Sequence, residues 1–357
     1  MKKKLVAVAI AGLLAAPLAQ AQTANVTLYG VLNMDLDFVS SATEKDLGKL
    51  NRVTSNASRI GFRGSESLGG GLNAIFQIES QFDENGSGAL SSRDTFVGLE
   101  GGWGKVRLGN MLTPYDQAHA FFGNAPTFTQ SILQTGALWG QYGRAKNAGG
   151  FGKRLGSSVR YDTPNISGLT GAVQYSTDET VNHGWIGGLG LYYKNAGLQL
   201  AAVYETNQDT GTGADADDQA LTLTGGYDFG IIRPALVYEY IIYKNSVGKL
   251  KRHLYGGSLT APLGPGKLYG AVIYADKGKG DAARGRLGGL AYGDDTEALQ
   301  YEISYTYPLS KRTSVYAGYV IIDNEKNSSY TFSSGAIAGN QPGVDQQGVV
   351  FGIAHFF

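Results

Sequence analysis

The last ten residues, Gly348-Val349-Val350-Phe351-Gly352-Ile353-Ala354-His355-Phe356-Phe357, alternate in the manner of a β-strand. One face of this strand carries Val349, Phe351, Ile353, His355 and Phe357. Chain termini usually fray unless they belong to a folded element, and an exposed apolar edge strand invites aggregation. We therefore expect this strand to pair with residues 26–38, the first strand, and to close a sheet into a barrel that leaves no edge in lipid.

The N-terminus has the pattern of a secretory signal peptide. A basic segment at residues 2–4 precedes an apolar segment at 5–18, and Ala19-Gln20-Ala21 forms a cleavage site. We expect residues 1–21 to be removed on export and residues 22–357 to form one outer-membrane β-barrel. No later run of about eighteen apolar residues occurs, so the sequence offers no candidate transmembrane helix.

The composition favours strands and tight turns over helices. The chain has 53 Gly, about twice the usual usage of roughly 7%, with 22 Tyr and only 9 Pro. It has no Cys, so disulfides cannot stabilise it. Removal of the three signal lysines leaves 27 basic against 30 acidic side chains, a net of −3. This balance gives no indication of a nucleic-acid partner.

Segments of about ten alternating residues follow one another from Gln22 onward, which predicts an all-β fold. The predicted strands are 26–38, 52–63, 72–82, 93–100, 105–110, 157–163, 169–176, 185–194, 198–206, 220–229, 231–243, 252–263, 267–275, 296–309, 313–323 and 348–357. Sixteen is an even number, as bacterial outer-membrane barrels require. Short turns alternate with longer polar segments, which indicates periplasmic turns and extracellular loops.

Alternation also assigns faces. In residues 301–307 the polar positions Glu302, Ser304 and Thr306 are expected to line the lumen, opposite the aromatic and aliphatic positions. Aromatic residues near strand ends are expected to form girdles at the two membrane interfaces. These residues are Tyr29, Phe38, Tyr193, Tyr227, Tyr240, Tyr243 and Tyr307.

The stretch Ser58-Arg59-Ile60-Gly61-Phe62-Arg63-Gly64-Ser65-Glu66-Ser67-Leu68-Gly69-Gly70-Gly71-Leu72-Asn73-Ala74-Ile75-Phe76-Gln77 resembles the second and third strands of the general porins of beta-proteobacteria. Further similarities are Tyr29-Gly30-Val31, Thr95-Phe96-Val97-Gly98-Leu99, Ser158-Val159-Arg160-Tyr161-Asp162-Thr163-Pro164 and the His355 and Phe357 ending.

This resemblance implies a sixteen-stranded homotrimeric porin in outer-membrane lipid, with a third loop that folds into the lumen and narrows it. It also implies that the assembly machinery reads Phe357, and we include His355 and Phe351 in the same signal. The chain departs from the family at Asn110 and Ala354, where relatives often carry basic residues, so ion selectivity is not carried over.

Residues 111–155 form the longest insertion, and a segment of that length is usually functional or disordered. It contains Phe121, Phe122, Phe128, Leu138 and Trp139, which is too apolar for a loop in water. We expect it to fold into the barrel mouth and to present Asp116 to the channel. The alternative is an extracellular lid.

Rings of charged side chains govern which ions enter a pore. Arg59 and Arg63 alternate with Ile60 and Phe62, so both arginines are predicted to point inward. The same reasoning places Arg93 inward, opposite in sense to Phe96, and also the set Lys105, Arg107 and Arg160. A charge on the lipid face costs about 2–4 kcal/mol at the midplane, so these basic side chains should face the lumen. This argument does not say what each side chain does there. Each arginine could contact ions, or could form a bracing ion pair with Glu79, Asp94 or Glu302.

The function that these features favour is passive diffusion of ions and small hydrophilic solutes through a water-filled channel, because sixteen strands leave an open lumen. Two alternatives are an outer-membrane hydrolase, which would use His183 with Ser176 or Ser157, and a secreted all-β binding protein. Asp215, Asp217 and Asp218 could bind calcium, although a solvated loop is favoured because the hand-type spacing is absent. We expect no cofactor and no metal site.

Overall fold

The computed structural model describes residues 25–41, 48–123, 130–140, 150–177, 184–209, 215–281, 286–287, 290–332 and 341–357. The expected signal peptide lies outside this range, as do Phe128 and His183. Within it, no helix is long and apolar enough to cross a bilayer.

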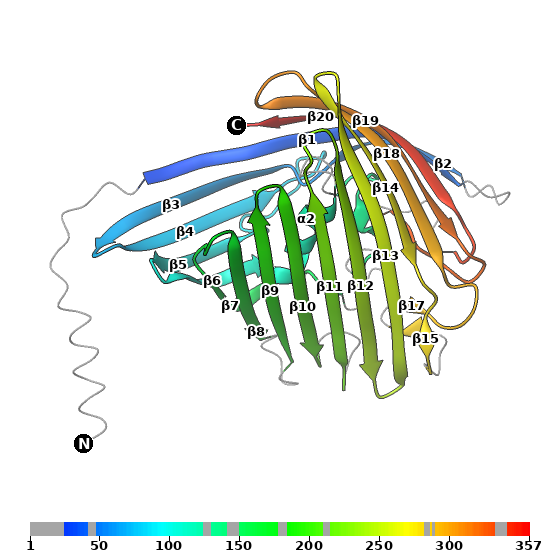
Figure 1. Ribbon diagram of the computed structural model, residues 1–357, viewed down its shortest axis with the longest axis horizontal. Coiled ribbons are helices and arrows are strands. Elements are labelled where there is room, and N and C mark those ends of the chain that lie inside the picture. The colour runs from blue at the N-terminus through cyan, green and yellow to red at the C-terminus, as the bar shows by residue number, and fades with distance from the viewer. Residues whose placement is uncertain are drawn as a thin grey trace.

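Most of the described chain is β-strand (Figure 1). The strands are β1 (Asn25–Ser41), β2 (Lys49–Ser55), β3 (Arg59–Gly69), β4 (Leu72–Gln81), β5 (Thr95–Gly101), β6 (Gly104–Leu112), β7 (Arg154–Asp162), β8 (Leu169–Thr177), β9 (Trp185–Asn195), β10 (Leu198–Gln208), β11 (Asp217–Tyr227), β12 (Arg233–Asn245), β13 (Gly248–Leu263), β14 (Gly266–Ala275), β15 (Lys279–Gly280), β16 (Arg286–Leu287), β17 (Leu290–Ala291), β18 (Ala298–Pro308), β19 (Thr313–Asn324) and β20 (Gln346–Phe356). The helices are η1 (Pro114–Ala118), α2 (His119–Phe122) and η3 (Thr135–Leu138).

One antiparallel sheet of 18 strands closes on itself. Within it, β2 and β3 are two halves of one wall strand, and β15 continues β14, so the barrel wall has sixteen strands. Closure is made by β1 and β20, whose register runs from Val31 opposite Phe356 to Ser41 opposite Gln346. The predicted pairing of the last strand with the first is confirmed.

The strand predicted over residues 52–63 is interrupted at Asn56–Ser58. Three residues there oppose two residues of β1, which is a β-bulge, and Ala57 has a φ of 54°. Asn33 and Ser58 stabilise the bulge, because the Asn33 amide donates to Ser58 Oγ at 3.0 Å. The bulge shifts the phase of the alternation: the outward positions are odd-numbered in β2, such as Val53, and even-numbered in β3, such as Phe62.

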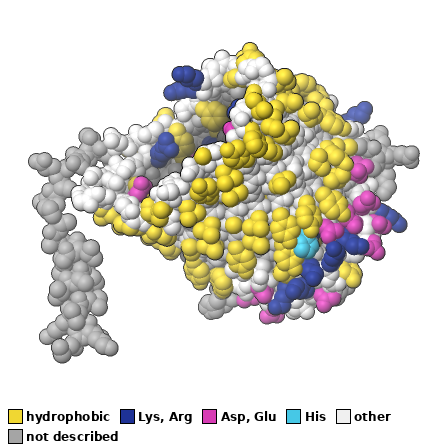
Figure 2. Space-filling model, viewed as in Figure 1, with side chains coloured by type: hydrophobic (Ala, Val, Ile, Leu, Met, Phe, Trp, Pro, Cys, Tyr) yellow, Lys and Arg dark blue, Asp and Glu magenta, His cyan; other side chains and the backbone are white. Residues whose placement is uncertain are grey.

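The outside of the wall is apolar and the inside is polar. Figure 2 shows hydrophobic side chains spread in a band over the strands. In β18, Tyr301 and Ile303 are exposed while Glu302 and Ser304 are buried, as the alternation predicts. The predicted aromatic girdle is wrong at Tyr29 and Tyr243, which face the lumen: Tyr29 Oη donates to Glu79 Oε2 at 2.9 Å, and Tyr243 stacks on Phe151.

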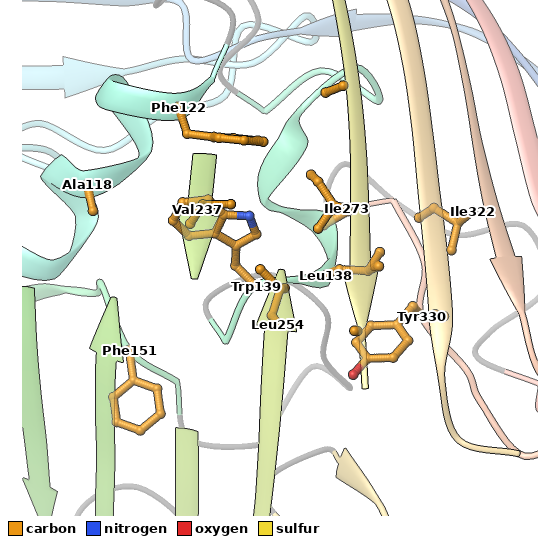
Figure 3. Close-up of a cluster of buried hydrophobic side chains, with 14 of the residues drawn as sticks. Ala118, Phe122, Leu138, Trp139, Phe151, Val237, Leu254, Ile273, Ile322 and Tyr330 are labelled. Carbon is orange, nitrogen blue, oxygen red and sulfur yellow. The ribbon is translucent and has the colours of Figure 1, made fainter. Parts of the chain in front are cut away.

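The barrel interior contains the described parts of the long loop between β6 and β7, called L3 here, which are residues 113–123, 130–140 and 150–153. Its residues Phe122, Leu138, Trp139 and Phe151 are almost fully buried. Figure 3 shows them among side chains of the barrel wall, such as Val237. The inward fold of L3 is therefore confirmed, and its cause is the burial of large apolar side chains that water would otherwise surround.

Candidate functional site

Three of the predicted arginines gather around Glu79 of β4. Arg93 forms an ion pair with Glu79, and Arg59 Nε lies 3.6 Å from Glu79 Oε2. Arg63 is exposed, with its guanidinium carbon 5.1 Å from the centroid of the Tyr29 ring. It forms no ion pair with another described residue. Arg63 is thus the member of this group that is most available to a passing ion.

The other two predicted arginines meet at Asp162 of β7. Arg107 Nη2 lies 2.6 Å from Asp162 Oδ2, and Arg160 Nη2 lies 2.9 Å from Asp162 Oδ1. The Arg160 side chain is only 3% exposed, and its Nη1 also donates to the Leu112 carbonyl at 2.9 Å.

Phe96 lies under the Arg107 guanidinium, on the lumen face, so the prediction that Phe96 points outward is wrong. The prediction counted the alternation from Arg93 to Phe96. Arg93 lies before the first residue of β5, so its side chain is not part of the alternating segment.

The sequence reasoning missed Arg154, whose Nε lies 2.6 Å from Asp94 Oδ1. With it, the wall from β3 to β7 holds six arginines, five of which form ion pairs with three carboxylates. These are Arg59, Arg63, Arg93, Arg107, Arg154 and Arg160, with Glu79, Asp94 and Asp162. The nine side chains leave three positive charges uncompensated. We call this surface the arginine wall.

L3 begins against the strands that follow the arginine wall around the barrel. Its helix η1 packs on β8 to β11, and Asp116 on this helix is half-buried. Both ends of L3 are held by Glu205 of β10, which accepts hydrogen bonds from the Thr113 hydroxyl and, at 3.1 Å, from the Gly152 amide. L3 therefore leaves the end of β6, packs on the inner face of β8 to β11 and returns to β7.

A second buried carboxylate, Glu239 of β12, holds the middle of L3. It accepts a hydrogen bond from the Tyr115 hydroxyl and, at 3.0 Å, one from the Gly140 amide. Arg252 Nη2 of β13 lies 2.7 Å from Glu239 Oε1 and balances its charge. The sequence marks Glu239 only as an inward position, because its partners depend on the path of a loop.

Helix α2 of L3 contributes His119, whose ring centroid lies 3.9 Å from that of Trp139. Burial within L3 lowers the pKa of His119 to about 3, so the imidazole is neutral at physiological pH. Neutral His119 adds no fixed charge to the channel.

The loop between β19 and β20, called L8, also turns inward. Its residues Tyr330 and Phe332 are buried, and the Tyr330 hydroxyl accepts a hydrogen bond from Arg252. Asn324 Nδ2 donates to the Tyr330 carbonyl at 2.9 Å. The aromatic residues Tyr330 and Phe332 in an otherwise polar loop were the sequence signal that could have predicted the inward turn of L8.

The residues proposed as an assembly signal share the lipid-facing side of β20. Phe351 makes an edge-to-face contact with Phe38 at 6.5 Å between ring centroids. His355 Nδ1 and Thr313 Oγ1 are 2.9 Å apart. The chain ends with Phe357 exposed on this same side.

Of the aspartates considered for calcium, Asp217 faces outward and Asp218 is buried on the lumen side of β11. Asp217 accepts hydrogen bonds from Gln208 and Gln219. In the part of the chain that the structure describes, no three His, Cys, Asp or Glu side chains are placed to hold a metal.

A closed sixteen-stranded barrel with a loop inside is the architecture of a porin, and a family model described as Gram-negative porin matches residues 6–327. The chain belongs to the Gram-negative porin family. Outer membrane porin protein 32 of Delftia acidovorans is 30% identical to this porin over 375 residues, which cover 100% of each chain. Major outer membrane protein P.IB of Neisseria gonorrhoeae is 29% identical over 284 residues, which cover 76% of this porin and 74% of the relative.

Solved structures agree on the fold of this porin. The anion-selective porin from Comamonas acidovorans superposes with a TM-score of 0.75 at 24% identity and covers 94% of this chain and 100% of its own. The trimer form of OmpT of Vibrio cholerae gives 0.68 at 17% identity, with 94% and 99% covered. The porin thus forms a water-filled channel across the outer membrane.

Proposed function

We propose that the channel is selective, with a weak preference for anions, and that its filter lies between the arginine wall and L3. The observation that carries this proposal is the excess of six arginines over three carboxylates on the arginine wall. Low-dielectric walls strengthen the field of such fixed charges. A structural relative is titled an anion-selective porin, which supports the same direction. Asn110, where relatives often carry Arg, keeps the preference weak.

Reversal potentials in a tenfold KCl gradient test this proposal. The double variant Arg59→Gln/Arg63→Gln should move the reversal potential toward that of a cation-preferring pore, and Asp116→Asn should move it toward anions. Arg312→Gln is the control, because Arg312 is an exposed arginine on the turn between β18 and β19, away from the lumen wall. Unchanged potentials in both test variants would place the filter elsewhere and make L3 a simple obstruction.

We also propose a homotrimer. The outer face near the barrel seam is broadly apolar, with Leu28, Leu36 and Phe62 between 45% and 53% exposed. One structural relative is titled a trimer form. Gly61 and Gly64 do not form a flat contact face here, since the Tyr29 and Phe76 rings fill the space above them. A high-mass band in unboiled samples that becomes a monomer on boiling supports the trimer, and a single monomer band in both overturns it.

Export and assembly complete the proposal. Cleavage after Ala21 should leave Gln22 as the first residue of the mature protein, which mass spectrometry of envelope fractions tests. The assembly machinery should then recognise Phe357 with the aromatic face of β20.

We further propose that the porin has no hydrolase activity. Ser176, the serine candidate in β8, faces the lumen and its hydroxyl donates to the Gly156 carbonyl at 2.6 Å. This bond engages the hydroxyl proton that a catalytic base would have to remove. Release of fatty acid from phospholipid vesicles by purified porin, lost in Ser176→Ala, would overturn this view.

A further inference from the structure

Arg252 of β13 is a charged side chain in an apolar part of the lumen wall. Its neighbours on the same face of the strand, Leu250 and Leu254, are buried, and so is Ile241, which lies directly opposite it on β12. The Arg252 side chain is itself only 1% exposed. A buried guanidinium costs free energy unless hydrogen-bond partners satisfy it, so the structure around Arg252 depends on its partners.

The guanidinium of Arg252 has one partner in the wall and one in a loop. Its Nη2 lies 2.7 Å from Glu239 Oε1, and its Nη1 donates a hydrogen bond to the Tyr330 hydroxyl. Its Nε has no hydrogen-bond partner among the described residues. Glu239 anchors the middle of L3, whereas Tyr330 belongs to L8. One buried guanidinium therefore connects L3 with L8.

On the L3 side, Glu239 holds two separate parts of the loop. It accepts a hydrogen bond from the Tyr115 hydroxyl and, at 3.0 Å, one from the Gly140 amide. Thr222 of β11 donates to the same Tyr115 hydroxyl at 2.9 Å, which orients its proton toward Glu239. Any displacement of the Glu239 carboxylate would weaken both contacts with L3.

On the L8 side, Asn324 at the end of β19 fixes the backbone around Tyr330. Its Nδ2 donates to the carbonyls of Tyr330 at 2.9 Å and Val344 at 2.8 Å. Its Oδ1 accepts hydrogen bonds from the Tyr330 amide at 2.9 Å and from the Ser328 hydroxyl at 3.0 Å. Tyr330 is thus bound to the frame of L8, so its hydroxyl moves with the loop.

L8 also helps to keep water away from the ion pair. Tyr330 of L8 and Leu138 of L3 belong to one buried cluster on the lumen wall (Figure 3). Phe332 of L8 joins the same cluster. The attraction between Arg252 and Glu239 is stronger in such a low-dielectric environment than in water. Removal of L8 would admit water to Arg252 and weaken its hold on Glu239.

We propose that L8 holds L3 in place through Arg252, with Tyr330 as the positioning residue. L8 lies at the end of the barrel opposite the short turn of residues 309–312, which is the extracellular side. An event at the cell surface that lifts L8 would withdraw Tyr330 and loosen Tyr115 and Gly140 at the constriction. Coupling of this kind is reciprocal, so release of L3 should also loosen L8. The coupling does not depend on the ion preference proposed above.

Single-cysteine reporters test this proposal, because the chain has no cysteine of its own. Ala137→Cys reports on L3 and Thr331→Cys on L8, since the natural residues are 1% and 7% exposed. The porin in phosphatidylcholine nanodiscs is treated with a polar maleimide, and the rate of mass increase measures how often each site opens. Tyr330→Phe should raise the rate at the L3 reporter at least fivefold. Tyr115→Phe should raise the rate at the L8 reporter in the same way.

Two controls separate this coupling from general loosening of the barrel. Tyr305→Phe removes a hydroxyl that donates to the Leu263 carbonyl at 2.8 Å near a periplasmic turn, and it should change neither rate. Ala354→Cys is a third reporter, at a buried position of β20 opposite Ser314 at the periplasmic end of the wall. A faster reaction at all three reporters in Tyr330→Phe would show general loosening and overturn the proposal.

A double-variant comparison tests whether the coupling runs through Glu239. Ser131 of L3 donates to another carboxylate, Asp35 Oδ2, at 2.8 Å, and within the described residues it shares no hydrogen-bond partner with Tyr330. The rate increases at the L3 reporter should therefore multiply in Ser131→Ala/Tyr330→Phe. They should fall short of the product in Tyr115→Phe/Tyr330→Phe, because both changes act on one carboxylate. An unchanged rate in Tyr330→Phe, or multiplied effects in both double variants, would overturn the proposal.

Discussion

The amide of Phe357 donates a hydrogen bond to the carbonyl of Gly30, and the Gly30 amide donates one back to Phe357, both at 3.1 Å. The Phe357 ring covers the Gly30 α-carbon so closely that a Cβ there would overlap it. The last residue of the chain therefore completes the seam of the barrel, and Gly30 is required because any larger residue would displace the ring.

Deletion of Phe357 should reduce the yield of folded barrel several-fold, because it removes two backbone hydrogen bonds and the ring that covers Gly30. Phe356→Ala should have a smaller effect, since Phe356 points to the other face of β20. The fraction of heat-modifiable protein in outer-membrane preparations measures both. Equal loss in the two variants would show that general apolarity of the C-terminus is what matters.

Tyr115→Phe should loosen L3. The change removes one donor from the buried carboxylate of Glu239, which should lower the free energy of unfolding by about 1–3 kcal/mol. Urea titration of the reconstituted porin measures this, and single-channel recordings should show larger current fluctuations.

The control for Tyr115→Phe is Tyr319→Phe, because the Tyr319 hydroxyl donates to Gln347 at 2.7 Å on the exposed outer surface. Its loss should change stability little. Current fluctuations in Tyr115→Phe no larger than in the wild type would mean that the remaining contacts of L3 are sufficient to hold the loop in place.

Arg63→Gln and Arg160→Gln should separate ion contact from bracing. Arg63 is exposed, so its neutralisation should shift the reversal potential toward cations and leave stability unchanged. Arg160 is buried against Asp162 and Leu112, so its loss should lower the free energy of unfolding by about 1–3 kcal/mol and change selectivity less. A loss of stability in Arg63→Gln, with the larger shift of the reversal potential in Arg160→Gln, would refute the assignment of ion contact to Arg63 and of bracing to Arg160.

Acid should destabilise the porin in part through His119. Burial lowers its pKa to about 3 in the folded barrel, whereas the unfolded chain has a pKa near 6.5. Unfolding therefore takes up a proton between these values, and the free energy of unfolding falls as the pH drops from about 6.5 toward 3. His119→Gln cannot titrate, so its stability should fall less between pH 7.5 and pH 4.5. Identical pH profiles for the two proteins would exclude this contribution.

The fold could be predicted from the sequence because lipid imposes a strict rule on every wall strand. A residue such as Ile303 must face outward if Glu302 faces inward, and closure must use the last strand. The predicted strands consequently agree with the observed ones to within a few residues at most ends. The hairpin of β12 and β13 is longer than predicted, because polar Lys249 and Lys251 extend it beyond the apolar band.

The site could be predicted only in part. Alternation predicted that the arginines face the lumen. Their carboxylate partners depend on the register between strands, which the loops and turns determine. Arg107 lies directly opposite Arg160, and Asp162 two residues further along β7 serves both. The positions of Phe96 and Tyr29 were misassigned because aromatic residues are tolerated in the lumen when they cover a glycine or support a guanidinium.

The seam has a consequence for how the barrel forms. Around the wall, each strand pairs with the strand that precedes or follows it in the chain, except where β1 meets β20. Fifteen of the sixteen junctions therefore join strands that are neighbours in the chain, whereas the sixteenth joins residues more than 300 positions apart, such as Val31 and Phe356. A barrel arrested before this step would be a curled ribbon with all of its hairpins complete and two unsatisfied borders. Completion of the barrel thus depends on one long-range contact, the pairing of β20 with β1.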